Sequence, residues 1–300
     1  MMQQAIEIGP VTVWPGQSAG KYPDGNQVIV RGRDSLAVFD TPIVAQTLPA
    51  ESGFADADLI ILGHVHEDHM AALGQLRDVP LHVHRGDLKA ARSWAGLAAH
   101  YGYATSILEP LHDKIVREFR YTPRPDAQGY DDGATWDLGG VQVRAIHMPG
   151  HTSGHCVLLV EPHGIAFIGD IDLSSFGPYY GDATSSLASF RTTLERIASL
   201  PASCWITSHH KGVICERTEF LHLLAAFTDR LRVREARLLA LLESGPQTLA
   251  ELAQSRVVYR PEASELWINA AEERSIAQHL DELMALGRVR REDAHFMLIA

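Results

Sequence analysis

The chain has 300 residues, of which 46% are hydrophobic, and a formal net charge of −11. This length exceeds what one hydrophobic core usually holds, so we expect two domains. The acidic balance argues against a general nucleic-acid surface, which needs a basic footprint, although it leaves room for a local basic patch. No apolar run approaches the ~18 residues of a membrane span. The N-terminus also lacks the charged lead and apolar core of a signal peptide. We therefore expect a cytoplasmic protein with no membrane partner.

The three cysteines, Cys156, Cys204 and Cys215, show no spacing typical of metal ligands. Their odd number fits no simple disulfide framework. Cys156 and Cys204 lie in apolar, strand-like runs, where cysteine behaves as a small hydrophobic residue. We therefore expect all three to be reduced thiols, as in the cytoplasm.

The first part of the chain is predicted to form β-strands. Three short runs rich in β-branched and aromatic residues lie at residues 11–14, 28–30 and 36–39. Turn-forming residues separate the last two runs, which favours a hairpin. Residues 59–62 are fully apolar and are bounded by a glycine, so they predict a buried strand. The composition becomes helical at residues 70–73.

The middle of the chain begins with residues 121–137, which are rich in Pro, Gly and Asp and are interpreted as an irregular surface loop. Apolar runs then predict three strands, at residues 141–146, 156–160 and 165–168. Residues 185–200 carry apolar side chains at spacings of three and four, which is typical of an amphipathic helix.

Residues 64–69 read His-Val-His-Glu-Asp-His, shortly after the apolar strand. Alternate residues of a strand point to the same side, so His64 and His66 can reach one ion together. If the chain then turns into a helix, Asp68 and His69 point back toward a second ion. Three imidazoles and a carboxylate in so short a run favour metal binding over a solvated polar loop.

This run resembles the HxHxDH motif of the metallo-β-lactamase superfamily, and further motifs of that superfamily follow in order. Residues 149–152 read Pro-Gly-His-Thr and resemble its third segment, with His151 as a ligand to the first metal. Asp170 follows Gly169 at the end of an apolar run and resembles the Asp that bridges both metals. Weaker similarity at residues 39–41, Phe-Asp-Thr, extends the resemblance toward the N-terminus.

Residues 205–209 read Trp-Ile-Thr-Ser-His and resemble the superfamily's last strand and final ligand. Ser208, a small residue, favours His209 over His210 in that position. The resemblance implies a four-layer αβ/βα sandwich over residues 1–231, with the metal site at one sheet edge. It also implies two groups of metal ligands around a shared carboxylate: His64, His66 and His151; Asp68, His69 and His209; and Asp170 between them.

The resemblance further implies two Zn²⁺ ions per chain and a hydroxide that bridges them, because such ions lower the pKa of bound water to near neutrality. Ligation by N and O atoms alone also suits iron and manganese. Asp68 would bind the second metal, orient the water and pass its proton to the leaving group, so it is the predicted catalytic residue. This chemistry indicates a hydrolase that acts on a small ester, lactone or thioester.

The branches of the superfamily leave several alternatives. Lactamases generally lack the bridging carboxylate that Asp170 supplies, so penicillin hydrolysis is disfavoured. Acyl-homoserine lactonases carry a substrate-contacting Tyr shortly after the bridging Asp, where this chain has Asp172 and Leu173; Tyr179 and Tyr180 come later. Glyoxalase II-type thioesterases share the ligands, but the chain shows no basic cluster for glutathione. A winged-helix endoribonuclease or phosphodiesterase, a mononuclear iron sulfur dioxygenase and a regulator without chemistry stay open.

The character of the chain changes at about residue 232. Residues 232–300 show three helical patterns and a terminal hairpin at residues 289–291 and 296–299, which resembles a winged helix. A capping box at residues 248–251 opens the second helix, and Gly287 ends the third. The third helix carries acidic residues that would repel phosphate: Glu272, Glu273, Asp281 and Glu282. We therefore expect this region to pack on the catalytic domain, line its pocket or form a homodimer, with a small molecule as substrate.

Overall fold

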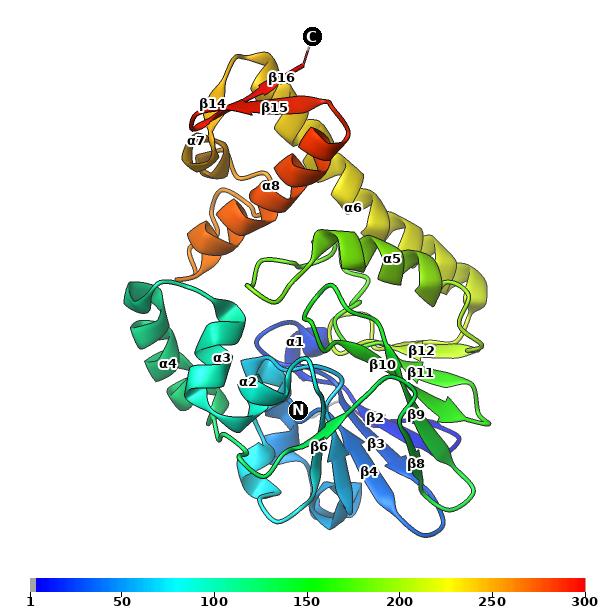
Figure 1. The fold of residues 1–300 in the computed structure, drawn as a ribbon. Coiled ribbons are helices and arrows are strands. Elements are labelled where there is room, and N and C mark those ends of the chain that lie inside the picture. Colours follow the sequence, from blue (N-terminus) through cyan, green and yellow to red (C-terminus); the bar gives the residue numbers. More distant parts are fainter. Residues whose placement is uncertain (1–3, 300) are drawn as a thin grey trace.

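The computed structural model describes residues 4–299, which form two large β-sheets flanked by helices (Figure 1). The first sheet has the strand order β1-β2-β3-β4-β5-β6-β7, and the second has the order β13-β12-β11-β10-β9-β8. The strands of the first sheet are β1 (Ile6–Ile8), β2 (Val11–Trp14), β3 (Gln27–Arg31), β4 (Leu36–Phe39), β5 (Leu59–Ile61), β6 (Leu81–His84) and β7 (Gln128–Tyr130). Those of the second are β8 (Thr135–Asp137), β9 (Gln142–His147), β10 (Cys156–Glu161), β11 (Ile165–Phe167), β12 (Cys204–Ile206) and β13 (Val213–Ile214).

Helices cover the outer faces of both sheets (Figure 1). Apolar residues of α2, α3 and α4 pack against the first sheet, and those of α5 and α6 pack against the second. Within the described residues, no helix combines the length and apolar character that a membrane crossing needs. The helices are α1 (Gln17–Gly20), α2 (Leu88–Arg92), α3 (Trp94–Tyr101), α4 (Thr105–Phe119), α5 (Leu187–Ile197), α6 (Arg217–Glu243), α7 (Leu249–Gln254) and α8 (Ile268–Ala285).

Strand β10 shows why the sheets stack as they do. Successive side chains of a strand point to opposite faces. Leu158 and Val160 therefore enter the core between the two sheets, whereas Val157 and Leu159 enter the core beneath α5 and α6. A strand buried on both faces has no polar alternation, which is the pattern of residues 156–160. The helix–sheet–sheet–helix order confirms the predicted four-layer sandwich.

The C-terminal region forms a separate small core. Leu238 and Leu242 of α6, together with apolar residues of α7 and α8, pack against a three-stranded sheet of order β14-β16-β15. Its strands are β14 (Gln247–Thr248), β15 (Val289–Glu292) and β16 (His295–Leu298). The capping box between Thr248 and Glu251 is present. Helix α6 runs without a break across residue 231, so the domain boundary, like the winged-helix resemblance, stays a prediction.

Two expectations about local structure are wrong. Residues 121–137 are not an irregular loop, because they contain β7 and β8. Each of these strands is short and lies at an edge of its sheet, where Gly and Asp in the pairing are tolerated. The residues after His69 form no α-helix; the 3₁₀ turns η4 (Glu67–His69) and η5 (Leu73–Gln75) take its place. The α-helices at residues 88–119 were not predicted.

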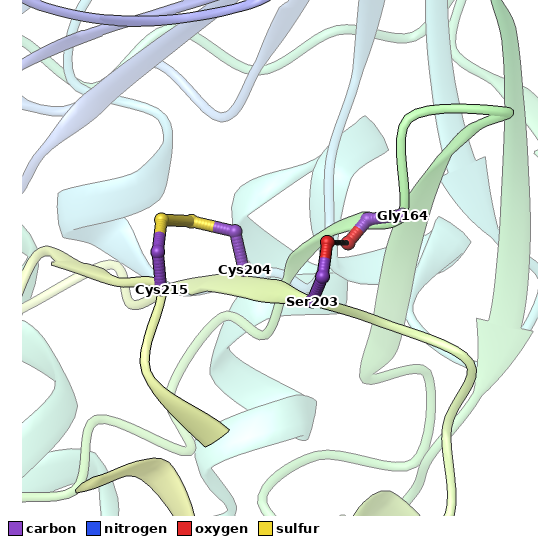
Figure 2. Close-up of a disulfide and its surroundings, with 4 residues drawn as sticks. All are labelled: Gly164, Ser203, Cys204 and Cys215. Atoms are coloured by element: carbon purple, nitrogen blue, oxygen red, sulfur yellow. Dashed lines mark hydrogen bonds between the residues drawn. A yellow bond between two sulfur atoms is a disulfide. The ribbon is translucent and has the colours of Figure 1, made fainter. Parts of the chain in front are cut away.

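The expectation of three reduced thiols is also wrong, because Cys204 and Cys215 form a disulfide (Figure 2). Strands β12 and β13 pair Trp205 with Ile214, which places the two cysteines directly opposite each other. Facing side chains on neighbouring antiparallel strands are close enough to be bridged. The odd number of cysteines misled the sequence argument, since the buried Cys156 stays free.

Candidate metal centre

The residues predicted to bind metal lie in loops that follow strands, and they gather at one edge of the two sheets. The run 64–69 follows β5 and ends in the turn η4. His151 lies between β9 and β10, while Asp170 follows β11 and His209 follows β12. Strands β11 and β12 are parallel neighbours, so their ends deliver these two residues to the same place. All the predicted ligands are buried except Asp170, whose side chain is 15% exposed.

The first group of ligands contains the three histidines predicted for one ion. His64, His66, His151 and Asp170 each offer a ligand atom, and these atoms lie within 4.8 Å of one another. Nδ1 of His66 lies 3.0 Å from Nε2 of His151. Oδ2 of Asp170 lies 3.3 Å from Nε2 of His151 and 3.8 Å from Nε2 of His64. The structure thus brings this predicted set together.

The second group contains Asp68, His69 and His209, whose ligand atoms also lie within 4.8 Å of one another. Nε2 of His209 lies 3.1 Å from Oδ2 of Asp68. The other carboxylate oxygen of Asp170, Oδ1, lies 3.2 Å from Nε2 of His69 and 3.5 Å from Nε2 of His209. Asp170 therefore turns one oxygen toward each group, which is the arrangement expected of a bridging carboxylate.

Unpaired polar atoms test whether these residues fit a metal ion. Nε2 of His64, Nε2 of His69 and Oδ1 of Asp170 are buried and have no hydrogen-bond partner among the described residues. Leaving a buried polar atom unsatisfied costs about 1–3 kcal/mol, so these atoms of the two ligand groups need partners that the described residues do not supply. Imidazole nitrogens and carboxylate oxygens are the ligands that Zn²⁺ and similar cations prefer. The donor set fits divalent metal ions.

Burial and mutual contacts shift the pKa values of the proposed ligands in opposite directions. Burial by itself would raise the pKa of the Asp170 carboxyl, but His69 and His209 hold that pKa well below its usual range. Burial and the neighbouring His69 keep the pKa of His64 well below its usual value. Asp170 is therefore a carboxylate and His64 a neutral imidazole, whereas the neighbouring carboxylates raise the pKa of His69 well above its usual value and that of His209 to about 10. His69 and His209 must therefore release a proton when a metal ion binds.

Several of the histidines are oriented through their other ring nitrogen. Nδ1 of His69 lies 2.7 Å from Oδ2 of Asp40, and Nε2 of His66 lies 2.8 Å from Oδ2 of Asp182. Nδ1 of His209 lies 2.8 Å from the carbonyl oxygen of Asp24. Such contacts fix the tautomer and the ring orientation of metal-binding histidines.

Asp182 was not predicted, and it connects the first group of ligands to a set of tyrosines. Besides contacting His66, it accepts hydrogen bonds from the hydroxyls of Tyr103, at 2.6 Å, and Tyr179, at 2.9 Å. On the opposite side of the motif, the buried Glu67 accepts hydrogen bonds from the hydroxyls of two further tyrosines, Tyr22 and Tyr101. No spacing in the sequence links these residues, because they come from four separate segments.

The remaining histidines near the site have other contacts. His210 adopts a positive φ of 56° and lies 3.8 Å from Asp172, outside both groups. The structure thus brings His209, and not His210, to the predicted position. His155 is buried, and its Nε2 accepts a hydrogen bond from the backbone amide of Asp170 at 3.2 Å. It therefore supports Asp170 through the backbone, as a local hydrogen-bonding residue.

A cavity of about 340 Å³ opens beside both groups of ligands. Its floor includes His66, His151, Asp170 and His209. Residues of the C-terminal region form part of its wall, namely Tyr259, Glu265, Trp267 and Ile268. In Figure 1, α8 extends from the C-terminal sheet toward α3 and α4. Its first residue, Ile268, lines the cavity. This volume is within the range of small-molecule sites.

The sequence profile of the metallo-beta-lactamase superfamily matches residues 23–209, which include every predicted ligand. The chain belongs to this superfamily. A metallo-beta-lactamase family protein from Thermus thermophilus has a similar structure, with a TM-score of 0.72, 23% identity, and coverage of 97% of this chain and 99% of that one. At this identity the likeness shows the fold alone.

Two curated relatives are hydrolases. A hydroxyacylglutathione hydrolase of Aeromonas salmonicida is 28% identical over 51% of this chain and 48% of its own length. The acyl-coenzyme A thioesterase MBLAC2 of Homo sapiens is 28% identical over 60% of this chain and 70% of its own length. The chain thus spans about half of the first relative and somewhat more of the second. Together with the His and Asp clusters, these findings support a metal-dependent hydrolase of the superfamily.

Proposed function

We propose that this chain is a binuclear metal-dependent hydrolase that cleaves a thioester. The observation that carries the proposal is the convergence of two ligand groups on the two oxygens of Asp170, beside a cavity. One ion would be held by the first group and a second ion by the second group, with zinc as the expected metal. When bound, the ions would supply Lewis acidity and a water molecule that ionises near neutral pH.

Asp68 is the residue proposed to move the proton. Burial by itself would raise the pKa of its carboxyl, but His69 and His209 lower that pKa below the usual range. The ionised carboxylate can accept a proton from water and deliver it to the departing sulfur. In the overall reaction, water adds its oxygen to the carbonyl carbon and the carbon–sulfur bond breaks. The sulfur takes up a proton, which yields a carboxylic acid and a thiol.

The substrate class is inferred from the relatives and from the cavity. One relative is named a thioesterase and the other a hydrolase of an acylated glutathione. The cavity is lined by no lysine or arginine within the described residues. Metal ions could balance one scissile phosphate, but a nucleic-acid backbone carries further phosphates that are usually held by lysine and arginine. An endoribonuclease is therefore less well supported. Among the ester, lactone and thioester expected from the sequence, the thioester is the proposed substrate.

Metal analysis joined to activity assays tests the proposal. The purified protein should contain about two zinc ions per chain by elemental analysis and should hydrolyse acyl thioesters faster than lactones or bis(p-nitrophenyl) phosphate. A single iron ion, with oxidation of a persulfide, would instead identify a sulfur dioxygenase. His209→Ala should lose metal and activity. The neighbouring His210→Ala is the matched control and should retain its full metal content. The reverse outcome would refute the assignment of the second group.

A further inference from the structure

The cavity beside the metal centre has walls that suit only some acyl groups. Its lining includes seven aromatic side chains besides the histidines: Tyr22, Tyr101, Tyr103, Phe176, Tyr179, Tyr259 and Trp267. Aromatic faces bind flat rings better than chains of the same area, by about 0.5–1.5 kcal/mol per ring pair. The composition of the wall therefore favours a ring-bearing ligand.

Four of the five tyrosine hydroxyls of this wall already have acceptors. Tyr22 and Tyr101 donate to Glu67, and Tyr103 and Tyr179 donate to one oxygen of Asp182. A hydroxyl has a single proton to donate, so these four groups offer none to a ligand. An anionic group inside the cavity would lose its hydration beside six lining carboxylates and, among the described residues, no lysine or arginine, which is costly.

The cations near the cavity are also occupied. Nζ of Lys114 lies 2.7 Å from Glu265 and sits over the ring of Trp267. Arg274 sits over the ring of Tyr103 and donates to backbone carbonyls, including that of Gly181 at 2.7 Å. Neither cation is among the residues that line the cavity. A hydrogen-bond donor or a cation already contacts three carboxylates of the wall, Glu67, Asp182 and Glu265. These carboxylates therefore do not need a cationic ligand as partner.

The volume of the cavity indicates the size of the ring system that it can hold. An apolar cavity of about 150 Å³ is large enough to hold benzene, and this one measures about 340 Å³. About two fused rings therefore fit. The C-terminal region contacts the catalytic domain at this wall, where the rings of Tyr259 and Phe176 lie 5.4 Å apart and those of Trp267 and Tyr22 lie 6.3 Å apart.

We infer that this cavity is an acyl-binding site for a neutral, flat ring system of about two fused rings, and that it rejects acyl groups bearing an anion. The inference rests on the proposed thioester hydrolysis, because only that reaction makes the group in the cavity the acyl part of the substrate. The ring would lie against the aromatic side chains that the catalytic domain and the C-terminal region together contribute to the cavity wall.

Five N-acetylcysteamine thioesters with the same leaving group test this inference: acetyl, benzoyl, 2-naphthoyl, 4-carboxybenzoyl and 4-(trimethylammonio)benzoyl. We expect kcat/KM, divided by the rate of uncatalysed hydrolysis, to rise from acetyl to benzoyl to 2-naphthoyl, by roughly tenfold or more overall. It should fall at least about tenfold from benzoyl to 4-carboxybenzoyl. A preference for acetyl, or for the trimethylammonio compound over 2-naphthoyl, would overturn the inference.

Two variants and a binding measurement separate the acyl site from the chemistry. Trp267→Ala should lower the ratio of 2-naphthoyl to acetyl activity, and Trp267→Phe should keep most of it. Trp136→Phe, on β8 and outside the cavity, is the control and should leave the ratio unchanged.

Calorimetry on the protein as purified should show binding of the neutral ketone 2-acetonaphthone, weakened by Trp267→Ala. If 2-acetonaphthone binds but no thioester is hydrolysed, the proposed function fails and the ring site stands. Hydrolysis without ketone binding refutes the ring site alone.

Discussion

Asp182 is expected to control how tightly the first group of ligands holds its metal ion. Its carboxylate lies 2.8 Å from Nε2 of His66 and also accepts the hydroxyls of Tyr103 and Tyr179. Asp182→Asn keeps the size of the side chain but removes its charge. A hydrogen bond to a charged group is worth about 1 kcal/mol more than a neutral one. Losing a carboxylate partner of a metal-binding histidine typically costs about 10–100-fold in metal affinity or activity, which is about 1.4–2.7 kcal/mol.

Competition with a chromogenic chelator measures this effect as stepwise metal affinities. Asp182→Asn should weaken one ion by about 10–100-fold and leave the other nearly unchanged. Asp40→Asn, which alters the partner of His69 at 2.7 Å, should weaken the other ion instead. Asp172→Asn serves as control, because its carboxylate contacts the amide of Ser174 and no nitrogen of a proposed ligand. Unchanged affinity in a folded Asp182→Asn protein would refute the positioning role.

Other parts of the chain can be tested in the same way. Asp68→Asn should lower kcat by about 10²–10⁴-fold; near-normal turnover with both ions retained would remove its proton-transfer role. Reduction of the Cys204–Cys215 disulfide, which spans a sequence separation of 11, should lower the free energy of unfolding in urea by about 3 kcal/mol, and an unchanged midpoint would contradict this. Burial lowers the pKa of His279 from 6.5 to about 3. The free energy of unfolding should therefore not depend on His279 above pH 6.5, and it should fall by up to about 1.4 kcal/mol per pH unit as the pH drops from 6.5 toward 3. His279→Asn should flatten this dependence of the unfolding free energy on pH in urea titrations, and an identical slope would contradict the prediction. The C-terminal region should not bind duplex DNA. The prediction would be refuted by tight DNA binding that depends steeply on salt concentration and that is lost on replacing three arginines at β15: Arg288, Arg290 and Arg291.

The clustering of the predicted metal ligands could be expected from the sequence because each lies next to a strand that can itself be recognised. The run 64–69 follows the apolar strand β5, and Asp170 follows the apolar strand β11. A strand end fixes where the next few side chains lie, so local patterns are sufficient. The disulfide could not be predicted from a local pattern, because its formation depends on the register of β12 against β13.

The cavity beside the two ligand groups could not be predicted from local sequence patterns. Asp182 and Tyr179 lie on the irregular segment between β11 and α5, and Tyr259 and Trp267 precede α8. None of these residues lies in a repeating pattern, and only the folded chain brings them together. Helix α4 was missed despite a usable signal, since its buried Leu111, Ile115 and Phe119 are spaced four apart.

Two of the four acidic residues of α8, Glu272 and Glu282, make structural contacts, whereas Glu273 and Asp281 are exposed. In the sequence they indicated a surface that repels phosphate. Glu272, however, is fully buried and accepts the backbone amides of Val258 and Tyr259 at 2.8 and 2.9 Å, so it holds a wall residue of the cavity. Glu282 pairs with Arg191 of α5. These carboxylates therefore stabilise the C-terminal region and its contact with the catalytic domain, and they cannot act as a free acidic surface.

Two arginines of the C-terminal helices hold the segment that carries Asp182. Arg234 of α6 is buried and donates to the carbonyl of Phe176 at 2.6 Å. Arg274 of α8 donates to the carbonyl of Gly181, directly before Asp182, at 2.7 Å. Because Asp182 in turn contacts His66, a continuous set of hydrogen bonds joins the C-terminal helices to the first group of ligands. The C-terminal region therefore contacts the proposed site in two ways: it supplies aromatic residues of the cavity wall, and it holds the loop whose Asp182 contacts His66.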